Sequence, residues 1–137
     1  MAEIDPPELS IAADYLARLV VKVRGLEARE AKVDPESGSN ASDDRMIDVL
    51  QEDAGDLSRL EVVREIQGLN DRQQAELVAL LWIGRGDAEP EEWERTVELA
   101  RERRDTPTPN YLLSEPLLSE FWEEGAERLG RPLPLGD

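Results

Sequence analysis

The sequence predicts an all-α fold, a compact single domain of five or six helices around a central apolar helix at about residues 71–84. Three observations support this prediction. Apolar residues recur at spacings of three and four along most of the chain, which is the period of an amphipathic helix. No stretch shows the alternating pattern of a half-buried strand. The run from Leu77 to Ile83 is apolar on every side, as expected of a helix enclosed by its neighbours.

The chain is 137 residues long, which suits one domain with one hydrophobic core. We expect a single helical domain over residues 1–130, interrupted by a loop at about 34–42 that is rich in turn-forming residues. Residues 131–137 contain two prolines and two small or acidic end residues. They are expected to form a flexible tail.

The N-terminal half contains three predicted helices, at about residues 8–33, 43–52 and 57–69. The first follows Pro6 and Pro7, because proline is favoured where a helix begins. Seven residues at helical spacing give it one buried stripe, and they are Ile11, Ala12, Tyr15, Leu16, Leu19, Val23 and Leu26.

The C-terminal half begins with the central helix. Asn70 followed by Gln73 has the spacing of a capping box, which predicts where this helix starts. The fifth helix is expected from about Pro90 to 104 or 105, and a proline-bounded turn follows at 106–114. The last helix is predicted at about 115–129, and Gly125 on its buried face predicts the close approach of another backbone.

The aromatic residues are expected to have different surroundings. Trp82 and Trp122 lie on apolar helix faces, which indicates core positions. Trp93 follows the glycine-containing joint closely enough to cover it. Tyr111, in the proline-bounded turn, is the aromatic residue that we expect to be partly exposed.

The composition excludes several classes of function. There is no cysteine and no histidine, which rules out thiolate and imidazole metal sites and the catalytic triads that need either residue. Acids outnumber bases by 32 to 16, for a net charge of −16. Such a surface repels phosphate backbones and anionic lipids, so we expect neither nucleic acid nor a membrane as a partner. The acidic N-terminus lacks the basic region of a signal peptide, and we expect a soluble cytoplasmic protein.

The central helix is followed by a joint, Gly84-Arg85-Gly86-Asp87. Counted as part of a calcium-binding loop, it would place Leu81, Ile83 and Arg85 where oxygen ligands are required, so calcium binding is excluded. The phosphate-loop pattern is absent as well. We interpret the two glycines as a helix stop and turn, with Arg85 free to reach a carboxylate within the chain.

The predicted fifth helix carries an acidic stripe at spacings of three and four, formed by Glu91, Glu94, Glu98, Glu102 and Asp105. At about 100° per residue these acids fall within a sector of roughly 80°. Carboxylates can bind magnesium, and small helical nucleotide pyrophosphohydrolases use E-x-x-E and E-x-x-D pairs for it. A metal cage needs ligands that converge from facing helices, whereas these lie along one helix. Acids that could complete a cage from another helix are Glu120, Glu123 and Glu124.

Four segments follow one another along nearly the whole chain, namely "VDPESGSNASDD" (33–44), "LNDRQQAELVALLWIGRGD" (69–87), "EEWERTVELA" (91–100) and "YLLSEPLLSEFWEEGAERLG" (111–130). Together they resemble a bacterial family catalogued as domain of unknown function 3775. The chain departs from the family pattern at Ser114, where glycine is common, and at Ala88, where an aromatic residue is common. The resemblance supports the domain boundaries and implies no activity, cofactor or binding residue.

We therefore expect a non-catalytic acidic interaction or regulatory module that binds a basic protein partner and needs no cofactor. The alternative is a magnesium-dependent nucleotide phosphohydrolase that uses the clustered carboxylates. Acids converging from two helices would favour the enzyme, and acids along one helix favour the module. No residue pattern sets the oligomeric state.

Overall fold

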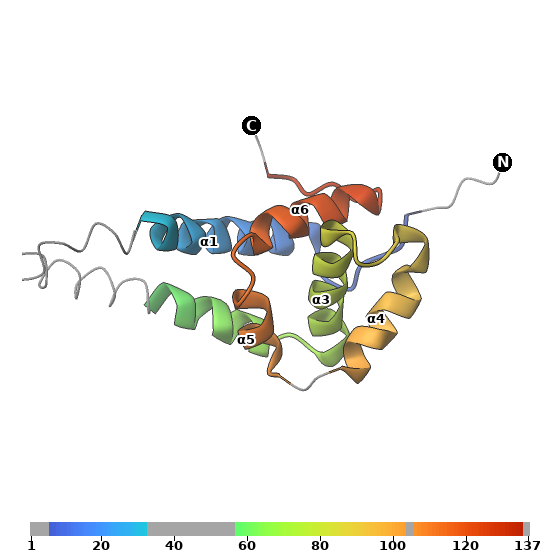
Figure 1. The fold of residues 1–137 in the computed structure, drawn as a ribbon, viewed down its shortest axis with the longest axis horizontal. Helices are drawn as coiled ribbons and strands as arrows, with labels where there is room; N and C mark the ends of the chain where they lie inside the picture. Colours follow the sequence, from blue (N-terminus) through green and yellow to red (C-terminus); the bar gives the residue numbers. More distant parts are fainter. Residues whose placement is uncertain (1–5, 33–56, 104–105, 136–137) are drawn as a thin grey trace, which may run out of the picture.

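A computed structural model describes residues 6–32, 57–103 and 106–135 (Figure 1). Every regular element in these ranges is helical, which confirms the all-α prediction. None of the helices described is long and apolar enough to cross a membrane. The predicted loop at 34–42 and helix at 43–52 lie outside the described residues. In chain order the elements are α1 (Ala13–Lys32), a helical stretch over 57–67, α3 (Asp71–Arg85), η2 (Pro90–Glu92), α4 (Trp93–Glu102), α5 (Thr108–Leu113) and α6 (Leu118–Arg128).

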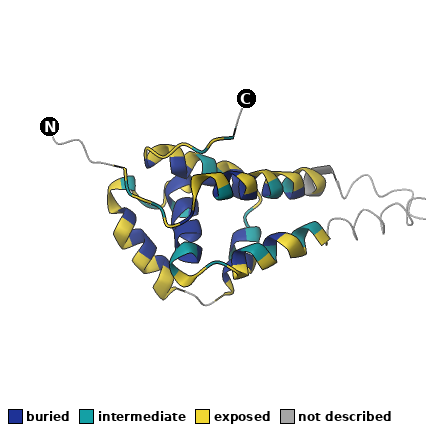
Figure 2. Ribbon diagram, turned by 180° about the vertical axis from the view of Figure 1, so that it is seen from behind, coloured by how far each residue is buried: buried dark blue, intermediate teal, exposed yellow. Residues whose placement is uncertain are grey.

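Helix α3 is the centre of the fold, as the apolar run predicts. The capping box is present, with the Gln73 amide nitrogen 2.8 Å from Asn70 Oδ1 and the Asn70 nitrogen 3.1 Å from Gln73 Oε1. From Gln74 to Gly84 every residue except Trp82 is buried. Helices α4, α5 and α6 pack around α3, and α6 also contacts α1. Figure 2 shows α3 almost entirely buried, while the outer faces of the surrounding helices are exposed.

Helices α3 and α6 cross in direct backbone contact. A Cβ atom added to Gly84 would lie 1.9 Å from the Phe121 carbonyl oxygen, and one added to Gly125 would lie 2.3 Å from the Leu80 carbonyl oxygen. The predicted close approach at Gly125 is therefore present. The interpretation of Gly84 as part of the helix stop was wrong, because Gly84 lies inside α3 and its lack of a side chain admits α6.

Helix α1 begins at Ala13, five residues later than the predicted start. Before this start, the buried Glu76 carboxylate of α3 accepts hydrogen bonds from the Ser10 nitrogen at 2.9 and 3.0 Å and from the Ile11 nitrogen at 3.3 Å. These bonds fix residues 10 and 11, which precede the helix, against α3. An acid in an otherwise apolar part of α3 thus anchors the segment that leads into the first helix.

Helix α6 begins at Leu118, three residues after the predicted start. Its own N-cap residue, Leu117, makes no side-chain capping bond. Instead, the Glu27 carboxylate of α1 accepts hydrogen bonds from the Ser119 nitrogen, at 3.0 Å, and from the Ser119 hydroxyl. The carboxylate gives a partner to an amide in the first turn of α6 that has none within the helix. Its negative charge also interacts favourably with the positive end of the helix dipole.

Residues 131–135, predicted as part of a flexible tail, follow α6 along the core. Leu133 and Leu135 are partly buried against it. Arg131 donates from Nε to the Pro7 carbonyl, at 3.0 Å, and from Nη2 to the Pro6 carbonyl, at 3.2 Å. The segment therefore lies against residues 6 and 7, and its flexibility remains a prediction.

Candidate functional site: an acidic helix face and a neighbouring pocket

The joint after α3 is closed by hydrogen bonds of its own residues. Gly86 has a φ of 90°, and its N–H donates to the carbonyls of Ile83 and Trp82. Arg85 Nε lies 2.7 Å from Asp87 Oδ2, and its Nη1 lies 3.3 Å from Glu115 Oε1. Arg85 thus reaches carboxylates on both sides and ties the joint to the segment before α6. Both of these Arg85 nitrogens donate to carboxylates of the same chain, which favours a structural role for Arg85.

The acidic stripe faces solvent along η2 and α4. Four of its members are described, and the side chains of Glu91, Glu94, Glu98 and Glu102 are all exposed. Asp105 lies outside the described residues. On its opposite side α4 is fixed against the core by four buried residues, Trp93, Thr96, Val97 and Ala100. This division of faces holds the carboxylates in place on the surface.

One member of the stripe is bound to α3. Arg72 donates from Nη1 and Nη2 to the two oxygens of Glu94, at 3.1 and 3.0 Å, and from Nε to Glu76 Oε2, at 3.0 Å. The hydrogen bonds from Arg72 lower the pKa of the Glu94 carboxyl below its ordinary value. Arg72 therefore connects the buried carboxylate of Glu76 to the surface of α4.

Glu76 is a polar residue whose role the sequence patterns did not predict. Its side chain is fully buried, and it binds two backbone amides and Arg72. A buried carboxylate requires such partners, because an unpaired charge in the interior is strongly destabilising. The signal in the sequence was a lone acid before the run from Leu77, with Arg72 four residues earlier.

The acids of the stripe do not gather with those of α6. Glu123 pairs with Arg24, and Glu124 pairs with Arg128 at 3.2 Å. Across the residues that the structure describes, no three acids come close enough together to hold a metal ion. Glu98 Oε2 lies 3.9 Å from Arg101 Nη1, which is a loose surface pair. The described members of the stripe can attract cations, but they do not surround one.

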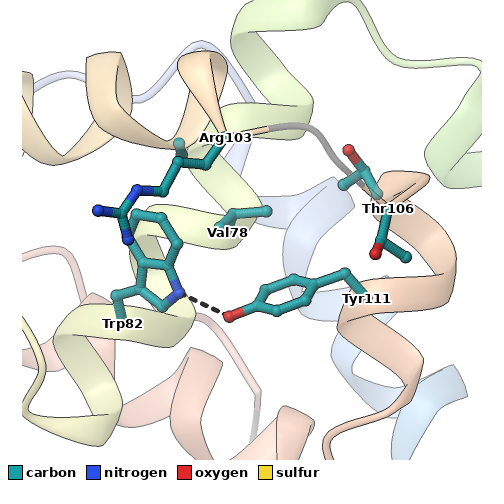
Figure 3. Close-up of a pocket in the computed structure, with 7 residues that line it drawn as sticks. Val78, Trp82, Arg103, Thr106 and Tyr111 are labelled. Carbon is teal, nitrogen blue, oxygen red and sulfur yellow. Dashed lines mark hydrogen bonds between the residues drawn. The ribbon is translucent and has the colours of Figure 1, made fainter.

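A pocket of about 240 Å³ lies between α3, α4 and α5 (Figure 3). The Trp82 indole and the Tyr111 ring meet across it, with Trp82 Nε1 donating to Tyr111 Oη at 2.8 Å. The prediction of a core position for Trp82 was wrong, because its indole is only partly buried and borders this pocket. Tyr111 is partly exposed, as expected. Trp122 is fully buried and donates from Nε1 to the Leu77 carbonyl at 2.9 Å.

The rest of the pocket wall combines apolar and polar groups. Val78 and Ala100 are buried in the wall. Arg103 is the residue that follows α4, and its side chain extends toward the Trp82 indole (Figure 3). Besides the Tyr111 hydroxyl, the α5 side carries two threonine hydroxyls, from Thr106 and Thr108. The described lining thus includes one cation, two threonine hydroxyls, two aromatic side chains and no acid.

These features define a small all-α domain with an acidic helix face and a separate aromatic pocket. Residues 59–131 match the family described as "Protein of unknown function (DUF3775)", and the chain belongs to this family. The match begins in the helical stretch before α3 and ends just after α6, so it includes the joint, α4 and the pocket. No curated protein and no solved structure matches the chain.

Proposed function

We propose that this domain is a non-catalytic interaction module whose acidic α4 face binds a basic protein partner. The observation that carries the proposal is the placement of Glu91, Glu98 and Glu102. They are exposed along one side of a helix whose other side is anchored in the core. Fixed surface charges of one sign steer and orient a partner of opposite charge.

The chain's own bases leave most of this face available. Arg72 occupies Glu94, whereas the bond from Arg101 to Glu98 is long. For Glu91 and Glu102, the described part of the chain provides no paired base. The net charge of −16 adds a long-range attraction for basic proteins. The module is also proposed to be cytoplasmic, because an acidic chain without cysteine suits that compartment.

The test compares two triple variants in the full chain. Glu91→Gln, Glu98→Gln and Glu102→Gln are combined in one variant. The matched control combines Glu8→Gln, Glu120→Gln and Glu127→Gln, which remove the same three charges from exposed positions elsewhere. The probe is a short oligolysine peptide, and its binding is measured by fluorescence anisotropy at physiological salt.

We expect the α4 variant to weaken peptide binding about tenfold and the control variant to weaken it about twofold or less. Equal weakening in both variants would show that net charge alone attracts the peptide, and it would refute a specific face. A magnesium-dependent release of pyrophosphate from nucleoside triphosphates that is lost in the α4 variant would establish the enzyme instead.

A further inference from the structure

We propose that the pocket between Trp82, Tyr111 and Arg103 binds a small organic anion, a carboxylate carried on a single flat ring. This site is separate from the acidic α4 face, and the inference does not rest on the proposed interaction with a basic protein. It rests on three properties of the described pocket: the local charge, the aromatic walls and the size.

The charge of the pocket is opposite to that of the chain. Acids are twice as numerous as bases in the sequence, yet the described lining contains Arg103 and no acid. Of the carboxylates that the structure describes, none forms an ion pair with Arg103. A guanidinium left without a carboxylate partner can accept a planar anion through two parallel hydrogen bonds.

The aromatic walls select a flat, apolar body for that anion. Trp82 and Tyr111 are held relative to one another by their 2.8 Å hydrogen bond, so the two rings form a preformed surface. Val78 and Ala100 extend the apolar wall. Rings stack favourably on such surfaces in offset or edge-to-face arrangements. The hydroxyl groups of Thr106 and Thr108 can donate hydrogen bonds to an anion's oxygen atoms.

Aromatic pockets also bind cations, and Arg103 decides against that possibility. A cation over the Trp82 indole would occupy the region toward which the Arg103 side chain extends (Figure 3). Like charges in one small pocket repel each other, and the lining residues that the structure describes include no acid to offset the repulsion. The positive charge of Arg103 therefore attracts an anion into the pocket and repels a cation.

The size limits the ligand to one ring. The cavity of about 240 Å³ is smaller than the roughly 300–1,000 Å³ typical of pockets for drug-sized ligands. The net negative charge of the chain opposes anions at long range, but salt screens charges beyond about 8 Å at physiological ionic strength. The short-range pairing with Arg103 therefore determines binding under those conditions.

The experiment titrates the full chain with benzoate, with its uncharged counterpart benzamide and with acetate, which lacks the ring. Binding is followed through the NMR signals of the three indole N–H groups. Trp82 reports on the pocket. Trp122, which donates to Leu77, and Trp93, which is buried, serve as internal references. Arg103→Gln is the test variant, and Arg95→Gln is the matched control because Arg95 is exposed on α4, the helix that Arg103 follows, and does not line the pocket.

We expect benzoate to shift the Trp82 signal saturably and more than the other two indole signals. Benzamide and acetate should each bind at least about tenfold more weakly, and Arg103→Gln should weaken benzoate binding by a similar factor. Arg95→Gln should change it less than about twofold. Because Arg103 is exposed, its variant should keep the Trp93 and Trp122 indole signals of the folded protein.

Three results would overturn the proposal. Equal affinity for benzoate and benzamide would show that binding does not depend on the negative charge of the ligand. Equal weakening by both arginine variants would show that Arg103 does not bind the ligand specifically. A titration that never saturates, or that shifts only the Trp93 or Trp122 signal, would show that the pocket does not bind the ring.

Discussion

Gly84 and Gly125 pack backbone against backbone where α3 crosses α6. A Cβ atom on Gly84 would lie 3.0 Å from the Gly125 nitrogen, and one on Gly125 would lie 3.2 Å from the Gly84 nitrogen. The two helices therefore meet without intervening side chains at this point. The contact also places Trp122 where it can donate to the Leu77 carbonyl of α3.

Gly84→Ala should destabilise the protein by at least about 2 kcal/mol, since the new methyl group meets backbone atoms that cannot turn aside. Chemical denaturation with urea measures the change in the free energy of unfolding. Gly25→Ala in α1 is the control, because its Cβ would meet nothing within 4 Å. That substitution should stabilise the helix by roughly 0.5–1 kcal/mol. A Gly84→Ala protein as stable as the wild type would mean that the crossing is looser than described.

Gly86→Ala should cost about 1 kcal/mol for a different reason. The nearest atom to a Cβ at this position is 4.0 Å away, so space is available, but the φ of 90° is strained for a residue with a side chain. Gly86→Asn should lose clearly less, because asparagine tolerates the left-handed conformation. The measurement is again urea denaturation. Equal losses for alanine and asparagine would argue against backbone strain as the cause.

Glu76→Gln should destabilise the protein by about 2–4 kcal/mol. The amide group of glutamine turns a donor toward groups that already donate, namely the Ser10 and Ile11 amides and Arg72. Hydrogen exchange should show lost protection at the Ser10 and Ile11 amides. Glu98→Gln, an exposed change on α4, should stay within about 0.5 kcal/mol of the wild type. Unchanged protection at both amides in Glu76→Gln would contradict this role.

The pairing of Arg72 with Glu94 predicts a pH dependence. Because hydrogen bonds from Arg72 lower the pKa of Glu94 below its ordinary 4.5, the folded protein binds this proton less readily than the unfolded chain. The stabilisation is complete above the ordinary pKa and is lost as the pH falls through the lower, folded-state pKa. The exposure of the Glu94 side chain is 72%, so we expect less than about 1 kcal/mol.

This dependence is measured as the difference in Tm between the wild type and Glu94→Gln, from neutral pH down to about pH 3. The difference should be largest at neutral pH and should shrink below about pH 4.5. Using the difference cancels the protonation of the other acids. A Tm difference that persists unchanged in acid would show that the carboxylate charge of Glu94 is not what stabilises the protein.

The parts of the fold that the sequence predicted depend on neighbouring residues. The capping bonds of Asn70 and Gln73 form within one turn, and the apolar run of α3 is read from its own residues. The start of α1 could not be found in this way. The segment before it is held by Glu76, which is 66 residues from Ser10 along the chain. A contact at that separation leaves no local pattern in the sequence.

The candidate site shows the same division. The exposed acids of α4 follow from helical periodicity, because their spacing and the apolar residues opposite them are both visible in the sequence. The pocket could not be predicted from periodicity, because Trp82, Arg103 and Tyr111 come from three separate parts of the chain. Likewise, glycine at position 84 suits either a helix stop or a helix crossing, and only the position of Phe121 decides between them.

The bond between Glu27 and Ser119 has a consequence for the order in which the chain folds. The two residues are 92 positions apart, so during synthesis the first helix is made long before the amide that it caps. Until α1 docks, α6 has no side-chain cap at its N-terminus. Contacts between such distant residues slow folding, because the ends of a long loop must meet before the bond forms. Helices α1 and α6 should therefore acquire their native protection against hydrogen exchange in the same kinetic step, with Glu27→Gln delaying that step for α6.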